Sequence, residues 1–112
     1  MAFSATLTVD SGIAKITMSG ELDASMTSVF QREIENAQTQ KAKRLVLLMS
    51  GLDYIASAGL RALVFAKQKM GPSVDIYVVG AQQQIIDTLQ MTGFDRSIII
   101  METYDVRAIE NI

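Results

Sequence analysis

The chain of 112 residues contains neither cysteine nor histidine. Without cysteine it forms no disulfide and offers no reactive thiol, and without either residue type the common zinc sites are excluded. Hydrolytic mechanisms that use a histidine base are excluded as well. The sequence also lacks a glycine-rich phosphate-binding loop. An enzyme would have to rely on carboxylates, lysine or hydroxyl groups, so we expect a protein with no catalytic residues, no metal and no cofactor.

Positive charge and long apolar runs are scarce too. The formal net charge is −2, and the one basic cluster lies at residues 41–44. A nucleic-acid partner requires a concentrated basic surface, so we expect none. No apolar run approaches the length of a membrane span, and the first residues do not have the pattern of a signal peptide. We therefore expect no membrane contact and a cytoplasmic location.

What is present is the hydropathy pattern of one α/β domain over residues 1–112. Apolar residues make up 49% and charged residues 20%, which is typical of a globular protein. Alternating or continuous apolar patterns predict strands at residues 3–9, 13–18, 45–49, 74–79 and 97–101. Helical spacing predicts helices near residues 24–38, 57–70, 81–92 and 103–110, with Asp23 or Ser25 capping the first and Thr103 the last. The order ββαβαβαβα predicts a mixed β-sheet with helices packed on it.

The stretch from residue 51 to residue 63 joins the continuous apolar strand to the second helix, and Ser57 stands at the start of that helix. Parallel α/β sheets present their functional groups at this edge. A serine in this position can simply cap the helix with its hydroxyl. Ala58 and Gly59 leave little bulk beside the hydroxyl, and a helix start favours negative charge. Ser57 is therefore also a candidate phosphorylation site.

Two short motifs resemble the signatures of a known family. Residues 56–60, Ala-Ser-Ala-Gly-Leu, are similar to the Asp-Ser-(Ser/Thr/Ala)-Gly-Leu loop of the STAS domain of bacterial anti-sigma factor antagonists. In that loop the first serine is phosphorylated. Residues 20–23, Gly-Glu-Leu-Asp, match a second signature, a turn after the second strand, and the predicted element order agrees with the STAS fold over essentially the whole chain. The chain departs from the pattern at Ala56, where an aspartate is common.

The resemblance implies a partner-switching protein rather than an enzyme. In that family the unphosphorylated antagonist binds an anti-sigma factor, a serine kinase with a GHKL-type ATP site, and so frees the sigma factor. The kinase phosphorylates the loop serine, and a PP2C-type phosphatase removes the phosphate. Ser57 is then the phosphoacceptor, and the partner-binding residues that we expect around it are Glu21, Leu22, Asp23, Ile55, Ala56, Ala58, Gly59, Arg61 and Phe65.

Two alternatives remain beside partner switching. The chain is then either a STAS scaffold that does not switch, in a signalling or transporter assembly, or a sensor of a small molecule or nucleotide. The sensor would use a pocket beside the helix start, where an anion is favoured. The carboxylates of Glu21 and Asp23 also have a simpler interpretation, since acidic residues stabilise the first turn of any helix.

Two of the expected contacts come from geometry. The second and third strands end at the same edge if they run parallel, which places residues 21–23 beside Ser57. At about 100° per residue, Phe65 lies nearly opposite the apolar side of its helix and shares a side with Arg61. We therefore expect an exposed Phe65 ring that docks on a partner, because aromatic and arginine side chains anchor many interfaces. Burial of the ring by a neighbouring element is the alternative.

Overall fold

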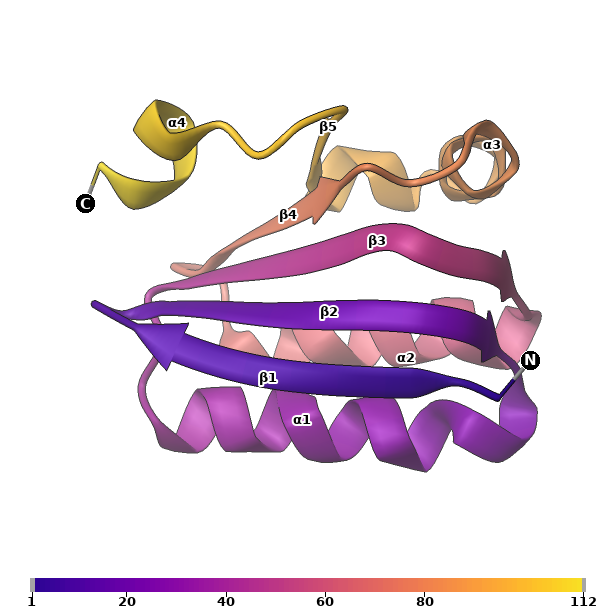
Figure 1. Cartoon of the computed structure of the whole chain (residues 1–112), viewed down its shortest axis with the longest axis horizontal. Coiled ribbons are helices and arrows are strands. Elements are labelled where there is room, and N and C mark those ends of the chain that lie inside the picture. Colours follow the sequence, from indigo (N-terminus) through magenta and orange to yellow (C-terminus); the bar gives the residue numbers. More distant parts are fainter. Residues whose placement is uncertain (1, 112) are drawn as a thin grey trace.

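The computed structural model describes residues 2–111, which form a five-stranded sheet with helices on both faces (Figure 1). The strands are β1 (Ser4–Asp10), β2 (Ile13–Leu22), β3 (Arg44–Ile55), β4 (Asp75–Val79) and β5 (Ile99–Met101). They lie side by side in chain order. β1 runs antiparallel to β2, and every later pair is parallel. The mixed sheet predicted from the sequence is confirmed.

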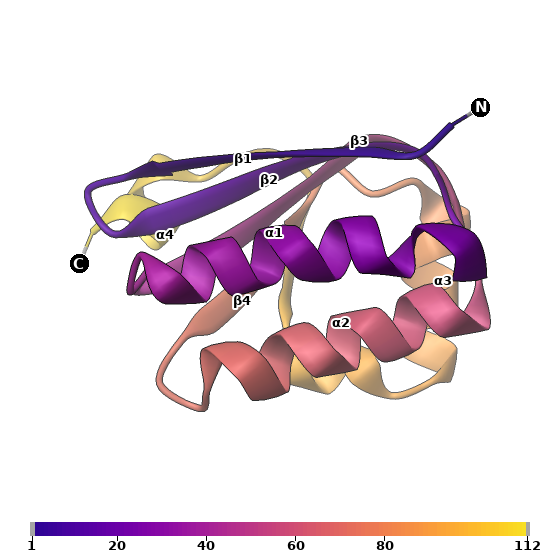
Figure 2. The same cartoon turned by 90° about the horizontal axis from the view of Figure 1, so that it is seen from below.

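The helices occupy the two faces of the sheet unequally. They are α1 (Thr27–Thr39), α2 (Ser57–Met70), α3 (Gln83–Met91) and α4 (Val106–Glu110), with 3₁₀ turns η1 (Ala24–Met26) and η2 (Phe94–Ser97). α1 and α2 run side by side beneath one face of the sheet (Figure 2), and α4 packs on the other. Within residues 2–111, none of these helices combines the length and apolarity needed to cross a membrane.

The hydrophobic core is divided by the sheet into two clusters. The larger one lies between the sheet and α1, α2 and α3, and it includes Phe30, Leu47 and Leu63. The smaller one lies under α4, where Ile109 packs with Val46 and other residues of the opposite sheet face. Because both faces of β3 are covered, the first half of this strand is a continuous apolar run. This explains why the sequence identified β3 so clearly.

The hairpin between β1 and β2 follows directly from its sequence. In β1, alternate residues are exposed and half-buried, as predicted. The turn residues Ser11 and Gly12 both have positive φ, 53° and 80°. Two successive positive φ angles are typical of the tight turns that match the twist of a hairpin.

Two strands extend further than predicted. β2 continues to Leu22 and β3 to Ile55, where the sequence analysis expected them to end at residues 18 and 49. The pairing of β2 with β3 shifts register between Thr17 and Ser19 and again after Gly20, whose φ is +83°. Such irregularities interrupt the alternation of side chains that sequence patterns rely on, while the backbone remains in the sheet.

The last third of the chain differs from the prediction at helix and strand ends. α4 begins at Val106, and its cap is Asp105, which accepts a hydrogen bond of 3.2 Å from the Ala108 amide. The predicted cap, Thr103, lies before the helix. Ser97, the first residue expected in the final strand, is the last residue of η2 instead, and β5 begins at Ile99, because Gly93, with φ of 78°, turns the chain after α3.

Candidate functional site

The site is built where β2 and β3 end side by side. The two strands are parallel, and Glu21 pairs with Tyr54 while Leu22 pairs with Ile55. The chain then turns into α2, and the Ala56 amide donates a 2.9 Å hydrogen bond to the Leu22 carbonyl. The expectation that residues 21–23 lie beside the Ser57 loop is therefore confirmed.

Gly59 allows this close approach of β2 to α2. A Cβ atom at this position would lie 2.8 Å from the Leu22 carbonyl oxygen and 2.8 Å from Cγ1 of Ile55. Contacts this short with backbone atoms do not occur, so a side chain at residue 59 would push the helix away from the strand. Leu22, Ile55 and Gly59 are all buried. They support the edge from inside in the free chain, and their contact with a partner stays a prediction.

Ser57 is exposed at the first position of α2 and does not cap the helix. The cap position belongs to Ala56, which has extended backbone angles and no side chain able to accept a hydrogen bond. Among residues 2–111, no group forms a hydrogen bond with the Ser57 hydroxyl. The first backbone bond of the helix runs from the Leu60 amide to the Ala56 carbonyl. The amides of the opening turn thus have no partner within the helix, and the capping interpretation of Ser57 is wrong.

Carboxylates and amides surround this edge. Asp23 caps η1 by accepting hydrogen bonds from the Ser25 amide at 3.0 Å and the Ser25 hydroxyl at 2.6 Å. Gln82 donates to the Asp53 carboxylate at 3.3 Å, and Gln84 donates to the Asp53 carbonyl at 2.9 Å. These glutamines tie the start of α3 to the end of β3. From the sequence alone, three consecutive glutamines are expected only to face solvent. Their place shortly after β4 is the signal that could have located them at this edge.

The expected exposure of Phe65 is wrong. Its ring is half-buried and packs against the larger core cluster. The buried side of α2 includes Gly59 and Ala62 besides the larger apolar residues, and it is therefore broader than the apolar pattern indicated. Phe65 lies only about 60° from Ala62 around the helix axis. The residues that do face solvent along α2 are Ser57, Arg61, Val64, Gln68 and Lys69, and 41% of Val64 is exposed.

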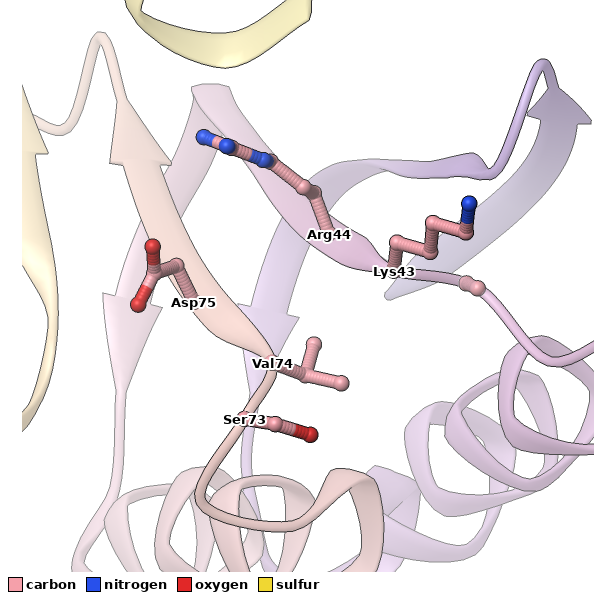
Figure 3. Close-up of a pocket in the computed structure, with 6 residues that line it drawn as sticks. Lys43, Arg44, Ser73, Val74 and Asp75 are labelled. Atoms are coloured by element: carbon pink, nitrogen blue, oxygen red, sulfur yellow. The ribbon is translucent and has the colours of Figure 1, made fainter. Parts of the chain in front are cut away.

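A separate cavity lies at the other end of the sheet. It has a volume of about 390 Å³ and is lined by residues 42–44 and 73–75, where β3 and β4 begin (Figure 3). Its side chains do not converge on a common point, and Arg44 turns toward α4 (Figure 3). There Arg44 donates hydrogen bonds to the Tyr77 hydroxyl and the Ala108 carbonyl. This cavity is separate from the Ser57 edge and gives the small-molecule sensor no support.

Known proteins resemble this chain in sequence and in structure. The STAS domain model matches residues 4–107. The anti-sigma-F factor antagonist RsfB of Mycobacterium tuberculosis is 26% identical over 102 residues, which cover 89% of this chain and 84% of RsfB. An anti-sigma factor antagonist from Mycobacterium paratuberculosis has a TM-score of 0.87 at 21% identity, covering 97% of this chain and 95% of that one.

A further structural neighbour is the Bacillus cell fate determinant SpoIIAA in its phosphorylated form. Its TM-score is 0.71 at 18% identity, and the superposition covers 98% of both chains. At these identities the two structures establish the fold, and the family model spans nearly the whole described chain. This chain belongs to the STAS domain family.

Proposed function

We propose that this chain is an anti-sigma factor antagonist that works by partner switching in the cytoplasm, as a binding protein without catalytic activity. In its unphosphorylated form it binds an anti-sigma factor that is a GHKL-type serine kinase. Phosphorylation of Ser57 releases the complex, and a PP2C-type phosphatase restores binding. The observation that carries the proposal is the exposed Ser57 hydroxyl, which has no partner among the described residues and stands beside the paired ends of β2 and β3. The names of RsfB and SpoIIAA support it.

A phosphate at Ser57 would change the docking surface strongly. It adds roughly −1.5 to −2 charges at neutral pH. On the free protein, the unpaired amides at the start of α2 would stabilise these charges. In a complex the same charges would have to be desolvated close to the carboxylates of Glu21 and Asp23. Each ~1.4 kcal/mol of this penalty weakens binding tenfold, so a moderate penalty is enough for a switch.

Ala56 leaves the position before Ser57 without the carboxylate that is common in this family. If the kinase or its magnesium ion uses that carboxylate, phosphorylation of this chain is slow or requires a specialised kinase. This departure favours one alternative function, a STAS scaffold that binds its partner permanently.

The experiment incubates the chain with each serine-kinase anti-sigma factor of the source organism, ATP and magnesium. Mass spectrometry then locates the phosphate, and the Ser57→Ala variant is the control. We expect modification at Ser57 alone and a loss of binding that the phosphatase reverses. Phosphate on Ser50 or Ser73 with Ser57 unmodified would contradict the assignment. Tight binding without any phosphorylation would instead support the scaffold.

A further inference from the structure

An apolar groove runs along the solvent side of α2 and begins about one helical turn after Ser57. It has a volume of about 340 Å³, and its lining comes from α2 and from the chain between α3 and β5: Leu60, Arg61, Val64, Thr92, Gly93, Phe94 and Ser97. Leu60 and Phe94 form its floor, since both pack against the larger core cluster. Val64 is 41% exposed, and Met91, next in the chain to the lining residue Thr92, is 87% exposed.

The charge of α2 indicates what this groove binds. The helix contains Arg61, Lys67 and Lys69 but no acidic residue, although the whole chain has a net charge of −2. Lys67 already donates to the Val74 carbonyl at 2.8 Å. Arg61 lines the groove, is exposed, and forms no ion pair with any residue from 2 to 111. The groove therefore combines apolar walls with one uncommitted guanidinium at its rim.

We infer that this groove binds an acidic amphipathic helix of the partner protein. An apolar side chain of that helix enters between Leu60, Val64 and Phe94, and a neighbouring carboxylate pairs with Arg61. Helices commonly bind to such grooves through their apolar face, and complementary charge selects the correct partner. The inference rests on the proposed function for the identity of the partner, the anti-sigma factor, but the chemistry of the groove stands independently of it.

Arg61 also connects the groove to the phosphorylation of Ser57. The two residues are four positions apart on α2, which places their side chains next to each other on the helix surface. A phosphate on Ser57 would form a charge-assisted pair with the Arg61 guanidinium. The partner's carboxylate would then have to compete for the same group. Phosphorylation thereby weakens docking in the groove without moving the backbone.

The test uses NMR on the full chain and needs no knowledge of the natural partner. The ¹⁵N-labelled protein is titrated with a synthetic helix that has leucines on one face and glutamates on the other. A matched peptide with lysine in place of each glutamate is the charge control. We expect saturable shifts of the Leu60, Val64 and Phe94 amides with the acidic peptide only. Arg61→Gln should weaken this binding roughly fivefold, as the loss of an exposed ion pair does.

Two further variants separate the groove from general surface effects. Val64→Ser should weaken peptide binding, whereas Val106→Ser on α4 should leave it unchanged. Shifts elsewhere on the protein, no binding, or equal binding of both peptides would overturn the inference. So would groove shifts with phosphatidylglycerol vesicles and none with the acidic peptide, because the groove would then bind a membrane. Kinase binding and Ser57 phosphorylation are measured in a separate experiment. The proposed partner switching and the proposed helix-binding groove can therefore fail independently of each other.

Discussion

Gly59 lets α2 pack closely against β2, and this packing positions the proposed site at Ser57. An alanine there would place its methyl group against the Leu22 carbonyl, which belongs to the backbone of a buried strand and cannot move aside. We expect Gly59→Ala to lower the free energy of unfolding by about 1–3 kcal/mol, the usual cost of overpacking. Urea denaturation measures this. Ala58→Ser, at the half-buried neighbouring position, should change stability by less than about 0.5 kcal/mol, like most surface substitutions.

Phe65 and Val64 are neighbours with opposite expected behaviour. The half-buried Phe65 ring packs on the core, whereas Val64 is 41% exposed. Phe65→Ala should lower the free energy of unfolding by about 1–3 kcal/mol, less than the full cost of removing a buried ring. Val64→Ala should leave stability nearly unchanged and weaken partner binding. Thermal melting and partner affinity of both variants measure the two effects; an unchanged melting temperature for Phe65→Ala would mean that the ring does not pack as described.

Side-chain alternation and helical spacing were enough to predict most elements but not the irregular ones. β1, the first half of β3 and α2 were recognisable because each presents one regular apolar pattern. The last residues of β3 include Gly51 and the exposed Asp53 and Tyr54, and the buried Leu52 and Ile55 are three positions apart, so this stretch lacks the regular pattern of a strand. Phe65 was misplaced because the small residues on the buried side of α2 carry little weight in an apolar pattern. Contacts that depend on tertiary packing, such as those of Asp53, were not predictable.

At the level of elements, α4 is attached to the sheet by a polar cluster. The Lys15 ammonium lies 3.6 Å from Glu110 and 4.5 Å from the centre of the Tyr104 ring, and the Tyr104 hydroxyl donates to Glu110. Burial, and next the hydrogen bond to Glu110, raise the pKa of Tyr104 above its usual value of 10.0. Interaction with Tyr104 is the main reason why the pKa of Lys15 is raised above 10.5.

This cluster predicts a loss of stability at alkaline pH. Both groups hold their proton more tightly in the folded chain than in the unfolded one. Their contribution to the free energy of unfolding is therefore complete below pH 10 and declines as the pH rises through the pKa values of the folded chain. Tyr104→Phe should make the free energy of unfolding less dependent on pH above 10 than in the wild type. Tyr54→Phe, at a residue that is 52% exposed, is the matched control. An identical pH profile for wild type and Tyr104→Phe would contradict the assignment.

For the whole molecule, the proposed switch is a change of charge on an otherwise unchanged fold. Phosphorylation adds roughly −1.5 to −2 charges to a chain whose net charge is −2. We expect Ser57→Asp to bind the anti-sigma factor more weakly than the wild type, and Ser57→Ala to bind but not be released by ATP. Calorimetric titration measures affinity, and circular dichroism should show unchanged secondary structure. A Ser57→Asp variant that binds as tightly as Ser57→Ala would argue against an electrostatic switch.

The placement of Gly20 has a practical consequence for how binding is measured. Any side chain at Gly20 would collide with the Ala2 carbonyl, so the first described residues lie against the second motif, at the edge that holds Ser57. α4 instead covers the start of β2, away from that edge (Figure 1). An affinity tag attached before Ala2 would shield the docking surface. Immobilising the protein through the end beyond α4 leaves Ser57 facing the analyte.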